Sequence, residues 1–323
     1  MIDQYGRTID YLRLSVTDLC NYRCQYCMPA DGVEKGPHGA VLSVEEYGEI
    51  ARAAVKLGIR KIRLTGGEPL VRRGSLDICR TLRAIPELKE LCLTTNGSLL
   101  PELAKPLQEA GVDRLNISLD TLRPEVFRQI TARDDFAAVQ AGLQAALESG
   151  LPVKLNCVPQ AGVNEGELEA LAALAKDNAL QVRFIEMMPI GYGAAMPCVS
   201  GPELRARFAN RWPELHPVEG TTFGNGPAVY YTVPGWKGSI GFIAAVHGKF
   251  CASCNRVRLT SQGFLRPCLA SETGCDLRAL LRGGADDARL RTAIRETIWS
   301  KPREHHFEDR CMPATCSMYR IGG

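Results

Sequence analysis

The chain has 323 residues, of which 45% are apolar and 23% are charged, and its formal net charge is +3. This composition predicts a globular protein with one large core or two linked cores. The net charge is too small to imply a surface that wraps nucleic acid, so we expect no nucleic-acid partner.

The cysteine content indicates the redox state of the cellular compartment in which the protein works. Thirteen cysteines occur without an apolar signal segment after Met1, which argues against a secreted disulfide scaffold and predicts reduced thiols in the cytoplasm. No stretch approaches the roughly 20 uninterrupted apolar residues of a membrane helix, so we expect no membrane partner.

Short apolar or β-branched runs alternate with amphipathic segments from residue 11 onward, which is the pattern of βαβ units in a parallel sheet. The clearest helix follows Ser43, has Glu46 as its capping-box partner and stops at Gly58. The six strand candidates are residues 12–16, 61–65, 90–95, 114–119, 153–158 and 181–186. Periodicity leaves open a doubly wound sheet or an incomplete barrel, and both place ligands at the carboxyl ends of the strands.

A C-x3-C-x2-C motif follows the first strand and comprises Cys20, Cys24 and Cys27, with Tyr26 before the last cysteine. A structural zinc ion or a cluster held only by protein requires four ligands, so three thiolates on a [4Fe–4S] cluster leave one iron open. The motif resembles that of the radical S-adenosylmethionine (SAM) enzymes, in which SAM chelates the open iron. The alternative is a chance grouping of core thiols or half of a zinc site.

Gly66, Gly67 and Glu68 follow the second strand, at the edge where the cysteines lie. Glycines let the backbone approach a ligand closely, and the Glu68 carboxylate can accept hydrogen bonds. Alone, such a segment is equally consistent with a plain turn. In the radical SAM enzymes the matching motif holds the amino group of SAM.

The βα pattern ends near residue 190, and Gly and Pro residues place a domain boundary near residue 225. The predicted domains are therefore residues 1–224 and 225–323. In the second we expect a strand at residues 239–245 and helices at residues 276–282 and 286–299.

A second trio, Cys251, Cys254 and Cys268, again offers three thiolates rather than four. An open iron is one interpretation, and a zinc ribbon completed by Cys275 or His247 is the other. Just after Cys254, Arg256 and Arg258 lie two residues apart, so an extended segment presents both guanidinium groups on one face. Such a pair suits phosphate oxygens, and a solvated surface pair is the alternative.

These motifs together resemble the GTP 3′,8-cyclase family of molybdenum cofactor biosynthesis, also called the MoaA family, over nearly the whole chain. The resemblance also rests on Leu93-Thr94-Thr95-Asn96-Gly97, on residues 116–120 and 182–188, and on the terminal Gly322-Gly323. It implies an incomplete (βα)6 TIM-like α/β barrel with a C-terminal extension of short strands and helices that carries a second Fe–S cluster.

The resemblance assigns roles residue by residue. Two [4Fe–4S] clusters are held by the trios Cys20, Cys24, Cys27 and Cys251, Cys254, Cys268. SAM contacts Tyr26, Gly67, Ser118 and Met188. GTP contacts Arg13, Arg63, Thr94, Lys154, Arg256, Val257 and Arg258. The tail residues Gly322 and Gly323 are required for a productive catalytic site.

The implied reaction converts GTP to 3′,8-cyclo-7,8-dihydro-GTP through a 5′-deoxyadenosyl radical. The implied partners are GTP, an electron-donating protein, the next enzyme of the pathway and, for assembly, a second copy in a homodimer. Two alternatives remain: a radical SAM peptide-modifying enzyme with an auxiliary cluster, and a non-enzymatic zinc-binding module that binds RNA. We expect His305 and His306 to be solvated. Cys311 and Cys316, just before the tail, depart from the usual pattern of the family and are open to redox damage or an adventitious metal contact.

Overall fold

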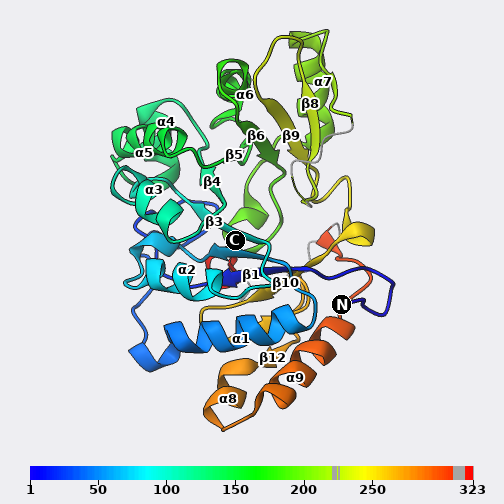
Figure 1. Ribbon diagram of the computed structural model, residues 1–323. Helices are drawn as coiled ribbons and strands as arrows, with labels where there is room; N and C mark the ends of the chain where they lie inside the picture. The colour runs from blue at the N-terminus through cyan, green and yellow to red at the C-terminus, as the bar shows by residue number, and fades with distance from the viewer. Residues whose placement is uncertain (220–223, 225, 308–316, 323) are drawn as a thin grey trace.

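Twelve strands form one continuous sheet in the order β12-β11-β10-β1-β2-β3-β4-β5-β6-β9-β8-β7 (Figure 1). The computed structural model describes residues 1–219, 224, 226–307 and 317–322. The strands are β1 (Tyr11–Ser15), β2 (Lys61–Thr65), β3 (Glu90–Thr95), β4 (Arg114–Ser118), β5 (Val153–Cys157), β6 (Gln181–Ile185), β7 (His216–Pro217), β8 (Val229–Thr232), β9 (Ser239–Ile243), β10 (Arg256–Leu259), β11 (Phe264–Arg266) and β12 (Cys275–Asp276). Across the described residues, the edge strands β12 and β7 do not pair, so the barrel is incomplete, as predicted.

Eight neighbouring strands, from β10 through β1–β6 to β9, are parallel. The six strands predicted from periodicity are β1 to β6, each within one residue of its expected bounds. The C-terminal segment extends both edges of this sheet, because β10 pairs with β1 and β9 pairs with β6. Strands on both sides of the predicted boundary at residue 225 therefore share one sheet, and the boundary itself stays a prediction.

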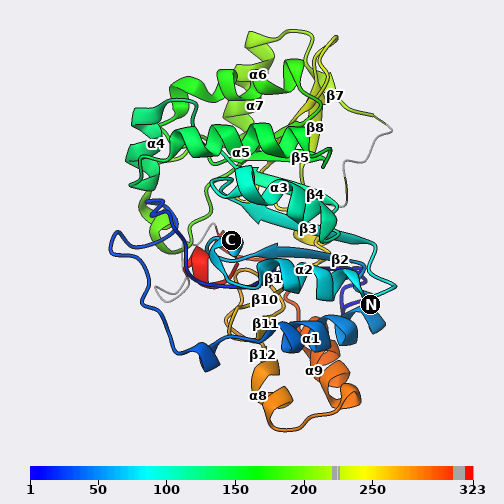
Figure 2. The same ribbon diagram turned by 60° about the vertical axis from the view of Figure 1, so that its left-hand side comes forward.

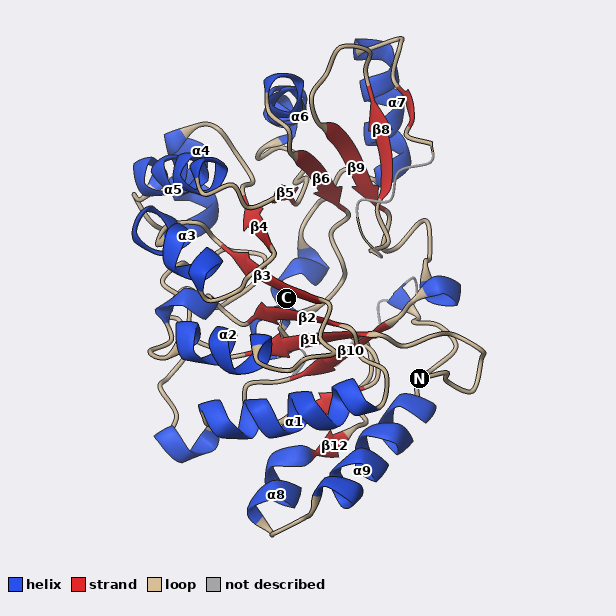
Figure 3. Cartoon of the chain, viewed as in Figure 1, coloured by secondary structure: helices blue, strands red, loops and turns tan. Residues whose placement is uncertain are grey.

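The helices lie along the outside of the curved sheet (Figure 3). They are α1 (Val44–Lys56), α2 (Ser75–Arg83), α3 (Leu100–Glu109), α4 (Pro124–Thr131), α5 (Phe136–Glu148), α6 (Leu168–Asp177), α7 (Gly201–Arg211), α8 (Leu277–Arg282) and α9 (Asp287–Trp299). The predicted capping box of α1 is present, with Ser43 and Glu46 bonded reciprocally at 2.7 and 3.2 Å. In the part of the chain that the structure describes, no helix has the length and apolar character needed to cross a membrane.

Helix α7 follows β6 but lies beyond residue 190, where the sequence analysis expects the βα pattern to end. The Ser200 hydroxyl accepts a hydrogen bond from the Glu203 amide at 3.3 Å, and Pro202 lies in the first turn. Ser at the N-cap followed by Pro in the first turn is typical of a helix start.

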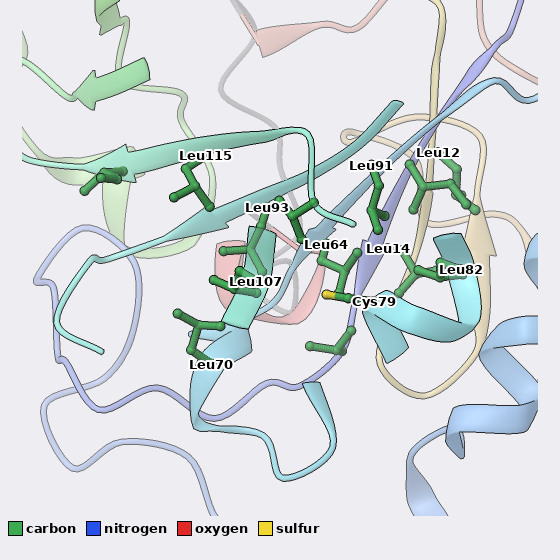
Figure 4. Packing of buried hydrophobic residues seen from close by; sticks show 14 of the residues in the cluster. Leu12, Leu14, Leu64, Leu70, Cys79, Leu82, Leu91, Leu93, Leu107 and Leu115 are labelled. Carbon is green, nitrogen blue, oxygen red and sulfur yellow. The ribbon is translucent and has the colours of Figure 1, made fainter. Parts of the chain in front are cut away.

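The strands of the parallel sheet are amphipathic, because successive side chains point to opposite faces. On the outer face, leucines such as Leu14, Leu64 and Leu93 pack against the helices and are fully buried (Figure 4). Burying each leucine stabilises the fold by about 1.5–3 kcal/mol relative to exposure. The inner face carries polar and charged side chains, and it therefore forms the wall of a polar chamber rather than a second apolar layer.

Candidate active site

One large cavity lies inside the curved sheet and extends along the parallel strands to the loops beyond their carboxyl ends. It is lined by both cysteine trios and by the predicted SAM residues Tyr26, Gly67, Ser118 and Met188. It is also lined by the predicted GTP residues Arg13, Arg63, Thr94, Lys154, Arg256 and Arg258. The side chain of Val257 points the other way and is buried in the apolar core, so only its backbone can face a ligand in the cavity.

The first cysteine trio lies in the loop that follows β1. Burial raises the pKa of the Cys20 thiol to about 11 and, with the nearby Cys20 and Asp120, that of Cys27 to about 12. The pKa of Cys24 is also raised by burial and by the neighbouring thiols Cys27 and Cys20. Three half-buried thiols that repel one another as thiolates fit a positively charged iron cluster, which stabilises the deprotonated form.

Gly66 and Gly67 hold this loop against the end of β2. The Gly67 amide donates to the Thr17 carbonyl at 2.7 Å, and a Cβ on Gly67 would lie 2.4 Å from the Leu19 carbonyl oxygen. The glycines therefore allow a close approach between two loops, besides any approach to a ligand.

The Glu68 carboxylate accepts three hydrogen bonds from other parts of the protein. The donors are the Leu70 amide at 3.1 Å, the Thr95 hydroxyl at 2.8 Å and the Asn96 amide at 2.7 Å. Burial nevertheless raises the pKa of Glu68 to about 7. Glu68 thus positions the ends of β2 and β3, and the Asn96 side chain continues the network by donating to Asn21 at 2.8 Å.

Tyr26, in the first cysteine loop, is fixed by a hydrogen bond to Asp120. Its hydroxyl donates to Asp120 at 2.7 Å, and the second Asp120 oxygen accepts from the Val158 amide at 2.8 Å. Burial raises the pKa of Asp120 to about 6. These bonds connect the loop to the ends of β4 and β5.

In the second cysteine trio, Cys251 and Cys254 lie between β9 and β10, and Cys268 follows β11. Burial raises the pKa of the Cys254 thiol, but the positive charges of Arg256 and Lys301 outweigh it and lower the pKa to about 7. The buried Lys301 ammonium donates to the carbonyls of Arg256 and Pro267 at 2.8 and 2.7 Å. Lys301 therefore both favours the thiolate and fixes the segments that carry Cys254 and Cys268.

Neither of the two residues considered as a fourth zinc ligand, His247 and Cys275, lies at this trio. His247 binds Glu186 through Nδ1, and neither His247 nor Cys275 lines the cavity. Among the described residues, no three His, Cys, Asp or Glu side chains are grouped as ligands of a single metal ion.

The expectation that His305 is solvated is wrong, whereas His306 is exposed as expected. His305 is buried and lines the cavity. Its ring stacks on Phe307 with 4.0 Å between centroids, and its backbone amide binds the Cys251 thiol. The burial depends on these tertiary contacts, for which a His-His dipeptide has no local signal.

A row of arginines crosses the inner face of the sheet. Arg258 of β10, Arg13 of β1 and Arg63 of β2 are aligned in the strand register. Burial, together with the charges of Arg63 and Arg256, lowers the pKa of Arg13 to about 10. The pKa of Arg258 is also lowered, by burial and by Arg13 and Arg256. Like charges held this closely in a buried place fit a polyanionic ligand.

Further cations that the sequence analysis missed also line the cavity: Lys61, Arg114, Arg183 and Lys301. Two of them are partly neutralised, because Glu90 lies 2.7 Å from Lys61 and 3.6 Å from Arg114. The period-two alternation of β2, β4 and β6 places Lys61, Arg114 and Arg183 on the inner face, and this signal was available in the sequence.

Several buried polar atoms of the cavity wall have no hydrogen-bond partner in the described structure. They are Oδ1 of Asn116, Oδ1 of Asn156, Nε of Arg183 and Nε of Arg256. Buried polar groups are nearly always hydrogen-bonded in folded proteins. Their arrangement therefore fits a polar ligand with both donors and acceptors.

The C-terminal tail enters this chamber, and the C-terminal end of the described chain lies in the middle of the molecule (Figures 1 and 2). The Gly322 carbonyl accepts hydrogen bonds from Arg258 at 2.6 Å and from Arg13 at 3.3 Å. Gly322 has a φ of +70°, and a Cβ there would lie 3.0 Å from the Thr65 methyl carbon. Gly323, Cys311 and Cys316 lie outside the described residues.

The lowered pKa of Lys154 leads to a testable prediction about proton uptake on ligand binding. Burial and the charges of Arg183, Arg114, Lys61 and Arg63 lower the pKa of Lys154 to about 6. A lysine with this pKa is neutral in the free protein near pH 8, and a bound triphosphate raises its pKa again.

We therefore expect GTP binding near pH 8 to take up close to one proton, and the affinity to fall as the pH rises above about 6. Calorimetry in two buffers of different ionisation enthalpy measures this uptake. A Lys154→Met variant should show almost none. Proton release by the unmodified protein would contradict the assignment.

Comparison with known proteins agrees with this geometry. Residues 14–175 match the radical SAM superfamily, and residues 180–307 match the family described as Molybdenum Cofactor Synthesis C. The partial barrel and the three-thiol loop thus define a radical SAM enzyme, a class that implies a [4Fe–4S] cluster and SAM.

Curated relatives narrow the class. The chain is 44% identical to the GTP 3′,8-cyclase of Petrotoga mobilis over 100% of both chains. It is 47% identical to that of Geobacter sulfurreducens, over 100% of this chain and 99% of the relative. The protein therefore belongs to the GTP 3′,8-cyclase family.

Solved structures show the fold. Streptococcus suis SuiB bound to S-adenosylmethionine superimposes with a TM-score of 0.62 at 15% identity, covering 89% of this chain and 68% of SuiB. At this identity the likeness concerns the fold alone.

Proposed function

We propose that the protein converts GTP to (8S)-3′,8-cyclo-7,8-dihydro-GTP, the first step of molybdenum cofactor biosynthesis. The observation that carries this proposal is that both three-thiol trios open into one cavity, whose wall carries the row of Arg258, Arg13 and Arg63. The full-length relatives named for this activity support it.

The two cysteine trios would hold two different clusters in the cavity. Cys20, Cys24 and Cys27 would hold the cluster whose open iron SAM chelates, beside Tyr26, Gly67, Ser118 and Met188. When bound, this cluster and SAM supply a 5′-deoxyadenosyl radical for removing the 3′ hydrogen of GTP. Cys251, Cys254 and Cys268 would hold a second [4Fe–4S] cluster, with an iron open to the guanine. We assign the first role to residues 1–224 and the second to residues 225–323.

The cations position the nucleotide. Arg13, Arg63, Lys154, Arg256 and Arg258, with Thr94 and the backbone of Val257, would bind the triphosphate and ribose. Each charge-assisted hydrogen bond contributes about 1.5–3 kcal/mol. The Gly322-Gly323 tail would be required for a productive site, and the Gly322 carbonyl contacts Arg13 and Arg258.

The two alternative functions are less well supported. A structure of SuiB bound to its precursor peptide SuiA also superimposes, but at 16% identity the likeness concerns the fold alone. The row of arginines in the cavity suits a triphosphate better than a peptide. A zinc-binding RNA module does not account for a cation row enclosed in a cavity rather than displayed on the surface.

The test is an anaerobic turnover with GTP deuterated at C3′, SAM and dithionite. We expect about eight irons per chain, a cyclised product, and deuterium transferred to 5′-deoxyadenosine. The Cys254→Ser variant should lose the product, whereas Cys198→Ser, at an exposed cysteine, should retain it. Unlabelled 5′-deoxyadenosine with intact GTP would contradict the proposal.

A further inference from the structure

A second hollow lies on the outer side of the first cysteine loop. The loop of residues 16–43, between β1 and α1, runs along the outside of the molecule (Figure 2). The hollow has a volume of about 300 Å³ and is lined by Leu19, Cys20, Asn21, Arg23, Val33, Lys35 and Val71. Cys20 lines both this hollow and the inner cavity. At Cys20, therefore, the chamber of the first cluster borders the outer surface.

The hollow has a positive rim that is fixed to the cysteine loop. The Arg23 guanidinium donates to the carbonyls of Cys20 and Tyr22 at 2.7 and 2.9 Å. It packs directly over Gly32, where a Cβ would lie 2.4 Å from its Nη2 atom. Arg23 is thus held in place by backbone on two sides.

Two exposed cations continue this rim. Arg133 donates to the Asn21 carbonyl at 2.8 Å, and Lys35 lines the hollow itself. The exposed Asp31 and Glu34 belong to the same loop but do not line the hollow, and no carboxylate occurs among its described lining residues. The charged side chains that line the hollow, Arg23 and Lys35, are therefore both positive, although the whole chain is nearly neutral.

The proposed reaction needs electrons from outside the protein. Conversion of SAM to methionine and 5′-deoxyadenosine consumes two electrons and one proton, since the cyclised product is an isomer of GTP. One electron reduces the first cluster before SAM is cleaved, and the second, with a proton from water, quenches the nucleotide radical. Neither GTP nor SAM supplies these electrons, so a one-electron carrier must do so.

We propose that the hollow over Cys20 is the docking surface of a small acidic protein that carries single electrons on a flavin or iron–sulfur centre. This inference rests on the proposed function. The carrier centre is oxidised by one electron as the cluster goes from [4Fe–4S]2+ to [4Fe–4S]+, and no bond is formed or broken. Charge complementarity steers such an encounter and makes it sensitive to salt.

The test compares two reductants for the same holoenzyme: flavodoxin in its hydroquinone form, as an acidic flavin carrier, and dithionite. With flavodoxin we expect Lys35→Glu to lower the cyclisation rate about threefold to tenfold at low salt, through weaker association. We also expect the rate of the unmodified enzyme to fall steeply as salt rises. With dithionite, Lys35→Glu should match the unmodified enzyme.

Lys105→Glu is the matched control, because Lys105 is exposed on α3 and takes the same change of charge. It should behave like the unmodified enzyme with both reductants. Equal flavodoxin kinetics for Lys35→Glu and Lys105→Glu, or the same loss of Lys35→Glu activity with dithionite, would overturn the docking surface. Absence of cyclised product from the unmodified enzyme with dithionite would instead overturn the proposed function.

Discussion

The Gly322→Ala variant is expected to lose cyclisation activity by about 30-fold or more while retaining its iron. A non-glycine residue at a φ of +70° carries a penalty of about 1–2 kcal/mol. The added methyl group would also lie 3.0 Å from the Thr65 methyl carbon and 3.2 Å from the Ser15 Cβ. Together these costs displace the tail from Arg13 and Arg258, and each 1.36 kcal/mol corresponds to a factor of ten.

Gly284→Ala is the control for the backbone penalty alone. Gly284 has a φ of +81°, and no atom lies within 4 Å of a Cβ built there. Single-turnover rates of product formation, with iron content measured in parallel, compare the two variants. Equal activities for both would show that the position of the tail does not matter for the reaction.

The Arg258→Met variant is expected to bind GTP about 10-fold to 150-fold more weakly, because one buried charge-assisted hydrogen bond of about 1.5–3 kcal/mol is lost. The same change should leave the stability of the ligand-free protein nearly unchanged, because the loss of a costly buried charge offsets the loss of the hydrogen bond to the Gly322 carbonyl. Burial and the like charges of Arg13 and Arg256 lower the pKa of Arg258. The charge of Arg258 therefore destabilises the ligand-free fold, and methionine removes this unfavourable charge.

Calorimetric titration with GTP and the unfolding temperature of the ligand-free protein measure the two effects. Arg52→Met, at an exposed position of α1, makes the same change away from the cavity and should affect neither. Loss of stability without loss of GTP affinity in Arg258→Met would remove Arg258 from the substrate site.

Local patterns predicted much of the fold. The strands β1 to β6 and the capped helix α1 each have a signal within a few consecutive residues. The edges of the sheet do not, since β10 pairs with β1 across some 245 residues of sequence. Short strands such as β7 and β12, two residues each, are defined only by their partners.

In the site, too, some residues have a local sequence signal and others are placed only by tertiary contacts. Cysteine spacing identified both trios, and the structure brings them into one cavity. Lys61, Arg114 and Arg183 were missed although the alternation of their strands places them on the inner face. Arg7 had no local signal at all: it is buried by tertiary contacts, and it donates to the carbonyls of Cys251 and Pro302 at 3.0 and 2.7 Å.

The central claim is that each trio leaves one iron open, the first to SAM and the second to GTP. The electron paramagnetic resonance spectrum of the reduced protein tests it most directly when recorded with SAM alone and with GTP alone. We predict two [4Fe–4S]+ signals, of which one changes only with SAM and the other only with GTP. A single signal, or two signals that neither ligand changes, would contradict the account.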